Sequence, residues 1–326
     1  MKDVLHLPDN EKERLGSFAK VQNDINKGSD QYELATANAI WPATGPEWYY
    51  EFLDIITGYY DGKVKELDYA ADPESCRKTI NNWVENRTND RIKDLIPEGD
   101  IDIFTYMVLT NAIYFKGEWI YEFNEDETDK APFYSPSGEV EVDMMGMKLE
   151  DDNKVPYYLG DDVQALELPY KGDELSMVLV LPSFGTLDDM ISDLDNALLE
   201  EIRSGLEPSN VQVKMPKLKL ETKYGLKDHL IDLGMPTAFS PGSADFSGMS
   251  AEGEEVYISK VIHQTFLEVD EEGTEAAAAT AVILRKYSAE SIPEFNANEP
   301  FLFYIQQRDT GNILFMGAIK DPSLSG

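Results

Sequence analysis

Cysteine is almost absent from this sequence. Cys76 is the one cysteine among 326 residues, so no disulfide bond can form within the chain. Cys76 falls in a segment with helical spacing of apolar residues, where a lone cysteine is more often a small core residue than a nucleophile. The cysteine content therefore does not indicate a redox compartment.

Positive charge is also scarce. Lys and Arg together number 28 against 62 Asp and Glu, which gives a formal net charge of −34. Phosphate groups are bound chiefly by Lys and Arg, so this balance argues against nucleic acid and anionic membranes as partners. Such an acidic protein is typical of a highly soluble surface or of adaptation to salt.

Long apolar runs are missing. No stretch of the sequence approaches the roughly 20 residues of a membrane helix. The opening residues, MKDVLHLPDN, are charged, and they lack the apolar run of roughly 7–15 residues that a signal peptide needs. We therefore expect neither a signal peptide nor a membrane anchor in this chain.

Catalytic and metal-binding motifs are absent as well. The histidines are His6, His229 and His263, and no pair of them has metal-ligand spacing. The chain has no G-x-S-x-G, H-E-x-x-H, P-loop or G-x-G-x-x-G sequence. His263 lies in a predicted strand, where a hydrogen-bonded core histidine is the preferred interpretation over a catalytic base. The sequence therefore predicts no enzyme, no metal site and no cofactor.

Two segments carry clear helix signals. Residues 72–86 have apolar residues at helical spacing, with Asp72 as the N-cap and Pro73 at the first helical position. Residues 185–205 are predicted to form one helix, which begins with a capping box at Thr186 and stops at a glycine.

Most of the remaining pattern is strand. The apolar run Tyr106–Phe115 predicts a strand buried on both faces. Residues 165–182 and 301–319 each predict a hairpin, with turns near Lys171–Asp173 and Thr310–Asn312. No repeat or composition break divides the chain, and helices do not alternate regularly with strands. We therefore expect one domain of the mixed α+β class.

The segment EEGTEAAAATAV, residues 271–282, permits several interpretations. It could be a helix, because alanine favours helices, or a flexible linker. It could also be a strand that forms later, because its side chains alternate between two faces and Gly273 provides a hinge. In the strand, the small and largely apolar inward face would consist of Thr274, Ala276, Ala278, Thr280 and Val282.

Several sequences together resemble the serpin family. They are LATANAIW, INNWVENRTNDRIKDLI, NAIYFKGEW, LELPYKGDELSMVLVLP, VDEEGTEAAAATA and NEPFLFYIQQRDTGNILFMGAIKDP. They occur in the family's order along nearly the whole chain. The resemblance implies a single domain over residues 1–326, with three β-sheets, a cap of helices and a metastable native state.

The same resemblance implies how the protein acts. Residues 271–297 would form the hinge and an exposed reactive-centre loop. A serine protease cleaves such a loop and forms an acyl-enzyme, after which the hinge side of the loop inserts as a new strand of the largest sheet. The protein would therefore be a suicide-substrate inhibitor and not an enzyme. The alternative is a non-inhibitory serpin that acts as a binding or chaperone protein.

The resemblance also assigns roles to individual residues outside the loop. Asn111 and His263 match a buried polar cluster beneath the strands that part for the loop. Trp119, Lys217 and Glu271 match the region where insertion begins, and the lysine pairs with the glutamate there. These residues would control insertion.

The cleaved bond follows from the family's spacing after the hinge glycine. Counted from Gly273, that spacing reaches Tyr287, so the predicted reactive bond is Tyr287–Ser288. A tyrosine at this position favours a chymotrypsin-like protease, whose specificity pocket is hydrophobic. A slightly different loop register would place Lys286, Arg285 or Glu290 there instead, and the first two would favour trypsin-like proteases.

The match begins near Val4–Leu7, and the helices and strand that the family has before this point are not found. We therefore expect a chain that is short at its N-terminus. The family resemblance favours an extracellular location, although a cytoplasmic one stays open. We expect a monomer, for which insertion of one molecule's loop into another is a route to polymers.

Overall fold

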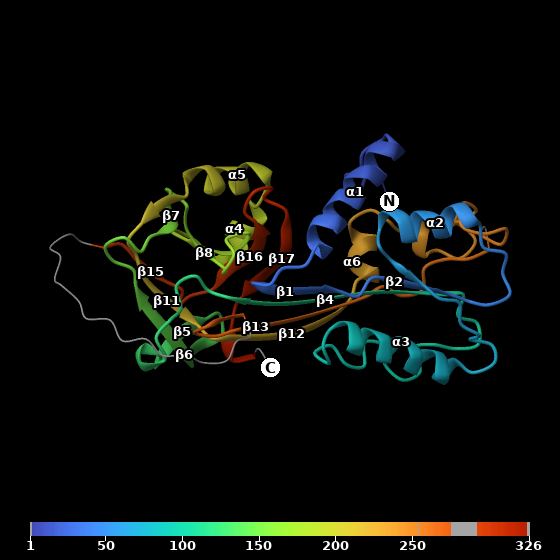
Figure 1. Ribbon diagram of the computed structural model, residues 1–326, viewed down its shortest axis with the longest axis horizontal. Helices are drawn as coiled ribbons and strands as arrows, with labels where there is room; N and C mark the ends of the chain where they lie inside the picture. The colour runs from blue at the N-terminus through green and yellow to red at the C-terminus, as the bar shows by residue number, and fades with distance from the viewer. Residues whose placement is uncertain (1, 254, 275–291, 325–326) are drawn as a thin grey trace. The chain divides into compact units, whose positions relative to one another are not determined.

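The computed structural model describes residues 2–253, 255–274 and 292–324 (Figure 1). Several sequence-predicted residues lie outside this part of the chain: Ala276, Ala278, Thr280, Val282, Arg285, Lys286, Tyr287, Ser288 and Glu290. The chain divides into two compact units. The first comprises Met1–Ser29, Leu34–Phe115 and Glu221–Phe266, and the second comprises Asp30–Glu33, Lys116–Leu220 and Leu267–Gly326.

The described residues form three β-sheets, which confirms the predicted α+β class with three sheets. The first sheet has the strand order β12 (Leu218–Gly225), β13 (Ile262–Val269), β4 (Met107–Glu118), β2 (Ala39–Pro42) and β3 (Lys63–Val64), while β1 (Tyr32–Thr36) and β14 (Gly273–Thr274) also pair with β4.

The other two sheets lie within the second unit. The six-stranded sheet has the order β10 (Glu207–Ser209), β7 (Val155–Leu159), β8 (Val163–Pro169), β9 (Leu175–Pro182), β16 (Phe301–Gln307) and β17 (Ile313–Ile319). The four-stranded sheet has the order β15 (Glu294–Asn296), β11 (Gln212–Pro216), β6 (Gly138–Lys148) and β5 (Asp129–Ser135).

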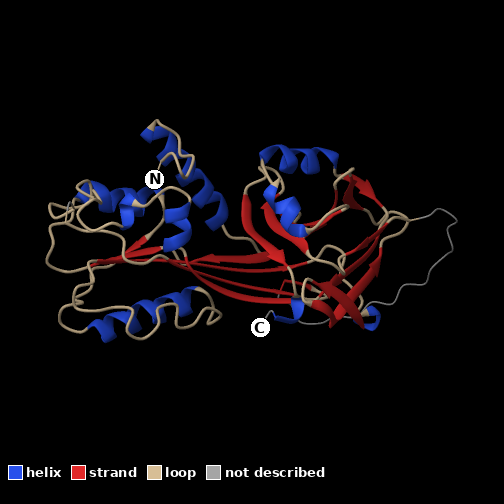
Figure 2. Ribbon diagram, turned by 180° about the vertical axis from the view of Figure 1, so that it is seen from behind, coloured by secondary structure: helices blue, strands red, loops and turns tan. Residues whose placement is uncertain are grey.

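Helices are present in both units (Figure 2). The first unit contains α1 (Glu11–Asn26), α2 (Tyr50–Tyr59), α3 (Pro73–Arg87), α6 (Lys227–Asp232) and the short 3-10 helix η2 (Thr237–Phe239). The second unit contains α4 (Leu187–Ser192), α5 (Asn196–Gly205) and the 3-10 helices η1 (Glu125–Glu127) and η3 (Pro322–Leu324).

Helix α3 forms as the sequence predicts. The side chain of Asp72 accepts a hydrogen bond from the Ser75 amide at 3.0 Å, and Pro73 follows the cap. This cap satisfies one of the amides that the first helical turn leaves unpaired. The apolar face of α3 joins a core of the first unit, whose members include Trp41, Cys76, Ile80, Val84, Ala112, Tyr114 and Phe266.

The prediction of one helix over residues 185–205 is wrong. The capping box at Thr186 is present, but α4 ends at Ser192 and α5 starts at Asn196. Asp195 causes the new start, because its carboxylate accepts a hydrogen bond from the Leu198 amide at 2.9 Å. Short acidic side chains favour caps over helix interiors, so the chain begins a second helix here.

The prediction that Tyr106–Phe115 is buried on both faces holds at Tyr114 and Phe115 but is wrong for the earlier part of the strand. Thr110 and Ala112 are buried on the face that packs against α3, whereas Leu109 is 47% exposed and Asn111 is exposed. The two sets alternate along the strand, as the period of a strand requires. In this part of β4 only one face is covered by the core.

The two predicted hairpins are confirmed, and their turns have the expected backbone. Gly172 and Asp173 have positive φ angles of 89° and 59° between β8 and β9, and Gly311 has φ 73° between β16 and β17. Strands β9 and β16 pair with each other, so the hairpins join into one continuous sheet.

Candidate functional site

The short strand β14 is the last segment that the structure describes before residue 275. Gly273 pairs with Glu118 and Thr274 with Gly117, both antiparallel. The side chain of Thr274 is fully buried, and its hydroxyl is 2.9 Å from the hydroxyl of Tyr170. The first residue of the predicted inward face therefore points into the protein.

Gly273 is held where no other residue fits. A Cβ atom at this position would lie 2.1 Å from the carbonyl oxygen of Gly117 and 2.6 Å from the Cα of Glu118. The backbones of β14 and β4 therefore approach each other more closely than a side chain would allow. A hinge at this residue depends on glycine for its packing as well as for its flexibility.

A turn at Asp270 leads into β14. One oxygen of its carboxylate accepts hydrogen bonds from the amides of Glu272 and Gly273, each at 3.1 Å. Burial raises the pKa of Asp270, although these two hydrogen bonds partly oppose the effect. Asp270 was not singled out from the sequence, because one aspartate among many acids gives no distinguishing signal.

Glu271 belongs to the same turn, and its side chain contacts other residues of the second unit. It is only 5% exposed, and its carboxylate accepts hydrogen bonds from Lys217 Nζ and Thr128 Oγ1, each at 2.7 Å. Burial acts to raise its pKa, but the hydrogen bonds from Lys217 and Thr128 outweigh burial and the pKa is lowered. The pair that the family resemblance implies is present. Thr128 was not predicted, since nothing in the sequence connects it with Glu271.

The side chain of Trp119 holds the turn at Asp270 in place. Its indole Nε1 donates a hydrogen bond to the carbonyl oxygen of Asp270 at 3.1 Å. The ring is buried and stacks on Tyr170, with 4.5 Å between ring centroids and 14° between ring planes. Tyr170 also contacts Thr274, so the stacked rings of Trp119 and Tyr170 pack against the hinge.

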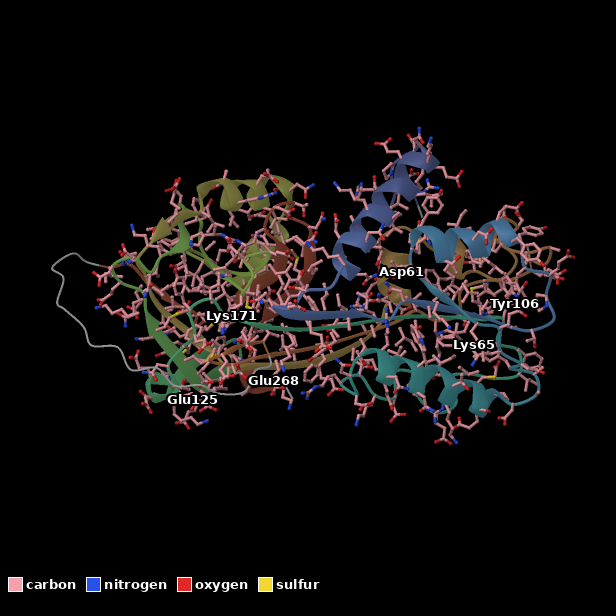
Figure 3. The ribbon with its side chains drawn as sticks, in the orientation of Figure 1. Asp61, Lys65, Tyr106, Glu125, Lys171 and Glu268 are labelled. Carbon is pink, nitrogen blue, oxygen red and sulfur yellow. The ribbon has the colours of Figure 1, made fainter. Side chains whose placement is uncertain are left out.

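Acidic side chains also surround the hinge. Lys171, labelled in Figure 3, donates hydrogen bonds to Glu118 at 2.7 Å and Glu122 at 2.8 Å. Burial raises the pKa of Glu272, and the nearby charges of Asp270 and Glu122 add to the effect. Few positively charged side chains therefore offset the repulsion among these carboxylates.

The predicted residues Asn111 and His263 come together in the first unit. They are directly opposite each other on the parallel strands β4 and β13, and His263 Nδ1 is 2.6 Å from Asn111 Oδ1. The amide nitrogen of Asn111 donates a hydrogen bond to Asn38 at 2.6 Å. Burial lowers the pKa of His263.

The expectation that this polar cluster is buried is wrong. His263 is half-buried, but Asn111 is exposed. The reason lies in the alternation of β4, because Asn111 is on the face opposite the core that contains α3.

No metal site is found in residues 2–253, 255–274 and 292–324, where no three His, Cys, Asp or Glu side chains gather closely enough to hold an ion. In the same ranges, no helix has both the length and the apolar character that crossing a membrane requires.

Comparison with known proteins gives consistent matches. The model of the serpin (serine protease inhibitor) family matches residues 1–322. An uncharacterized serpin-like protein of Methanosarcina mazei is 41% identical over 98% of this chain and 75% of its own length. Human Serpin B4 is 40% identical over 94% of this chain and 78% of its own length.

Solved structures agree. Serpin48, a highly specific serpin of the insect Tenebrio molitor, has a TM-score of 0.81 at 30% identity and covers 98% of this chain and 84% of its own. Uncleaved ovalbumin has a TM-score of 0.79 at 29% identity and covers 94% and 78%. Family and fold together support a protease-inhibitor type of function, with a target protease as the partner.

Proposed function

Because the chain belongs to the serpin family, we propose that it inhibits serine proteases as a suicide substrate. The protease cleaves a loop within residues 271–297, and its serine forms an ester with the new carboxyl end of the loop. The hinge side of the loop then enters the largest sheet as an additional strand. The protease is carried along and inactivated before water hydrolyses the ester.

The pairing of β14 with β4 is the observation that carries this proposal. Gly273 and Thr274 already form antiparallel pairs with β4, and Thr274 is buried. A strand that continued this ladder would next reach the stretch of β4 from Thr110 to Tyr114, which is paired with β13. Insertion would therefore require β4 and β13 to separate and the hydrogen bond between Asn111 and His263 to break.

The sequence after β14 supports the same proposal. Residues 275–286 contain no proline, and a strand within a sheet needs all of its backbone donors. Its predicted inward positions carry only alanine, threonine and valine. Small uncharged side chains would lower the barrier to entering a packed sheet.

We propose a chymotrypsin-like protease as the target and Tyr287–Ser288 as the reactive bond. The support is the spacing from Gly273 and the hydrophobic pocket of such proteases. Lys286, Arg285 and Glu290 are the alternatives if the register of the loop differs.

The test mixes the protein with chymotrypsin and separates the products on a denaturing gel. We expect a covalent band with the combined mass of the protease and the inhibitor, and a released peptide that begins at Ser288 by mass spectrometry. Trypsin provides the matched control, and a stronger complex with trypsin would move the bond to Lys286 or Arg285. Complete cleavage without a covalent band would instead favour a non-inhibitory binding role.

A further inference from the structure

A cavity of about 320 Å³ opens in the first unit, whereas the hinge residues belong to the second unit. It is bounded by the end of β12, the start of α6, the residues that lead into β13, and the segment that follows α3. Its volume lies at the lower end of the range of small-molecule sites in proteins.

The walls of the cavity carry an unusual charge for this chain. Lys223, Lys227 and Lys260 line the cavity together with Asp100 and Asp228, a formal excess of one positive charge among the lining residues, and Asp94 and Glu221 act on Lys223 from nearby. The protein as a whole has a net charge of −34. Among the lining residues the positive charges outnumber the negative ones, which is the reverse of the chain as a whole, so an anion is favoured here over the rest of the surface.

The three lysines differ in whether their ammonium groups already have hydrogen-bond or ion-pair partners. Lys260 forms an ion pair with Asp100 at 2.5 Å, and Lys223 donates a hydrogen bond to the carbonyl oxygen of Asp94 at 2.9 Å. Burial lowers the pKa of Lys223, and the nearby charges of Asp100, Asp94 and Glu221 partly oppose this effect. Lys227 is half-buried and has no hydrogen bond or ion pair with any residue that the structure describes. Its ammonium group is therefore available to a ligand.

The remaining wall is apolar. Pro97, Val261 and Ile262 line it, and Tyr224, a residue that is 48% exposed, adds an aromatic ring. Such a wall favours the body of an organic molecule over a bare inorganic ion, because apolar surface gains by leaving water.

We propose that this cavity binds a small organic anion, a carboxylate or sulfonate on an aromatic body, with Lys227 contacting the acid group and the apolar wall contacting the body. None of the lining residues belongs to the hinge, and only Ile262 belongs to β13, the strand that the proposed insertion separates from β4. The site can therefore be tested whether or not the protein inhibits a protease.

The experiment titrates the full chain with naphthalene-2-sulfonate by isothermal calorimetry. Naphthalene-2-sulfonamide supplies the same body without the charge, and inorganic sulfate supplies the charge without the body. We expect the sulfonate to bind at least about tenfold more tightly than either. Equal binding of the sulfonamide would overturn the role of the charge, and equal binding of sulfate would overturn the role of the apolar wall.

Lys227→Glu tests the assigned lysine. The change should weaken binding of the sulfonate roughly tenfold or more, because it reverses one charge beside the ligand. Lys63→Glu is the matched control, since Lys63 is an exposed lysine of the same unit outside the cavity, and it should leave binding nearly unchanged. Unchanged binding by the Lys227 variant, or an equal loss by the Lys63 variant, would overturn the site.

A second measurement needs no variant. Lysine acetylation of the native protein, read by mass spectrometry, should be slower at Lys227 when the sulfonate is present and unaltered at Lys63. Absence of protection at Lys227 would contradict the proposal even if a variant failed to fold.

Discussion

Lys217 Nζ lies 2.7 Å from Oε2 of Glu271, and the two side chains differ sharply in exposure, at 42% for the lysine and 6% for the glutamate. Thr128 donates to the other carboxylate oxygen. One buried carboxylate thus connects the start of β5, the link between β11 and β12, and the hinge. The contacts hold Glu271 in its ionised form.

Glu271→Gln should lower the stability of the protein by about 1–3 kcal/mol, because it removes a charged acceptor from a buried position and leaves its donors poorly satisfied. Chemical denaturation measures the effect. Glu268→Gln is the control, since Glu268 pairs more loosely with an exposed Lys219 at 3.7 Å, and it should cost no more than about 0.5 kcal/mol. Equal losses in both variants would show that Glu271 has no special role.

The contribution of Glu271 should depend on pH. Its pKa in the folded protein lies below the ordinary value of 4.5, so the stabilisation is complete above about pH 4.5 and is lost as the pH falls through the lower folded value. The difference in melting temperature between the native protein and Glu271→Gln should therefore narrow below pH 4.5. Carboxylates other than Glu271 titrate in both proteins, so most of their effect cancels. A difference that stays constant down to pH 3 would contradict the assignment.

Gly273→Ala should displace β14 from β4, because the new Cβ would meet the backbone of Gly117 and Glu118. Hydrogen exchange should become faster at the Trp119 amide, which bonds to the Glu272 carbonyl at 2.7 Å. Gly16→Ala in α1 is the matched control, as a Cβ there meets nothing within 4 Å, and alanine should stabilise that helix by up to about 1 kcal/mol. If hydrogen exchange at the Trp119 amide were unchanged in the Gly273→Ala variant, the claim that β14 and β4 lie too close together for a side chain at residue 273 would be wrong.

Thr280→Arg should convert the proposed inhibitor into a substrate, because a charge on the inward face slows strand insertion. Ala279→Arg places the same charge at the neighbouring position, which alternation assigns to the outward face, and should retain most of the inhibition. The fraction of protein that ends as covalent complex with chymotrypsin measures both. Similar fractions for the two variants would refute the assignment of the faces.

Cleavage of the loop without complex formation gives a further test. If the cleaved loop inserts, the cleaved protein gains a strand in its largest sheet and should melt well above the intact protein. Differential scanning calorimetry of the two forms makes the comparison. Equal melting temperatures would exclude insertion.

The sequence by itself determined the features that depend on near neighbours. Asp72 and Pro73 mark the start of α3, and the glycines at 172 and 311 mark the hairpin turns, because caps and turns are set within a few residues. The family motifs, read in order, gave the three-sheet fold and named Lys217 and Glu271 as partners.

Only the tertiary structure decided burial and distant contacts. Thr128 meets Glu271 across 143 residues, and Tyr170 meets Thr274 across 104. Neither contact leaves a local trace in the sequence. The exposure of Asn111 likewise depends on which face of β4 the core covers, and the alternation of a strand does not say which side that is. Local preference acts over one turn, whereas burial is set by segments that the chain brings together only when it folds.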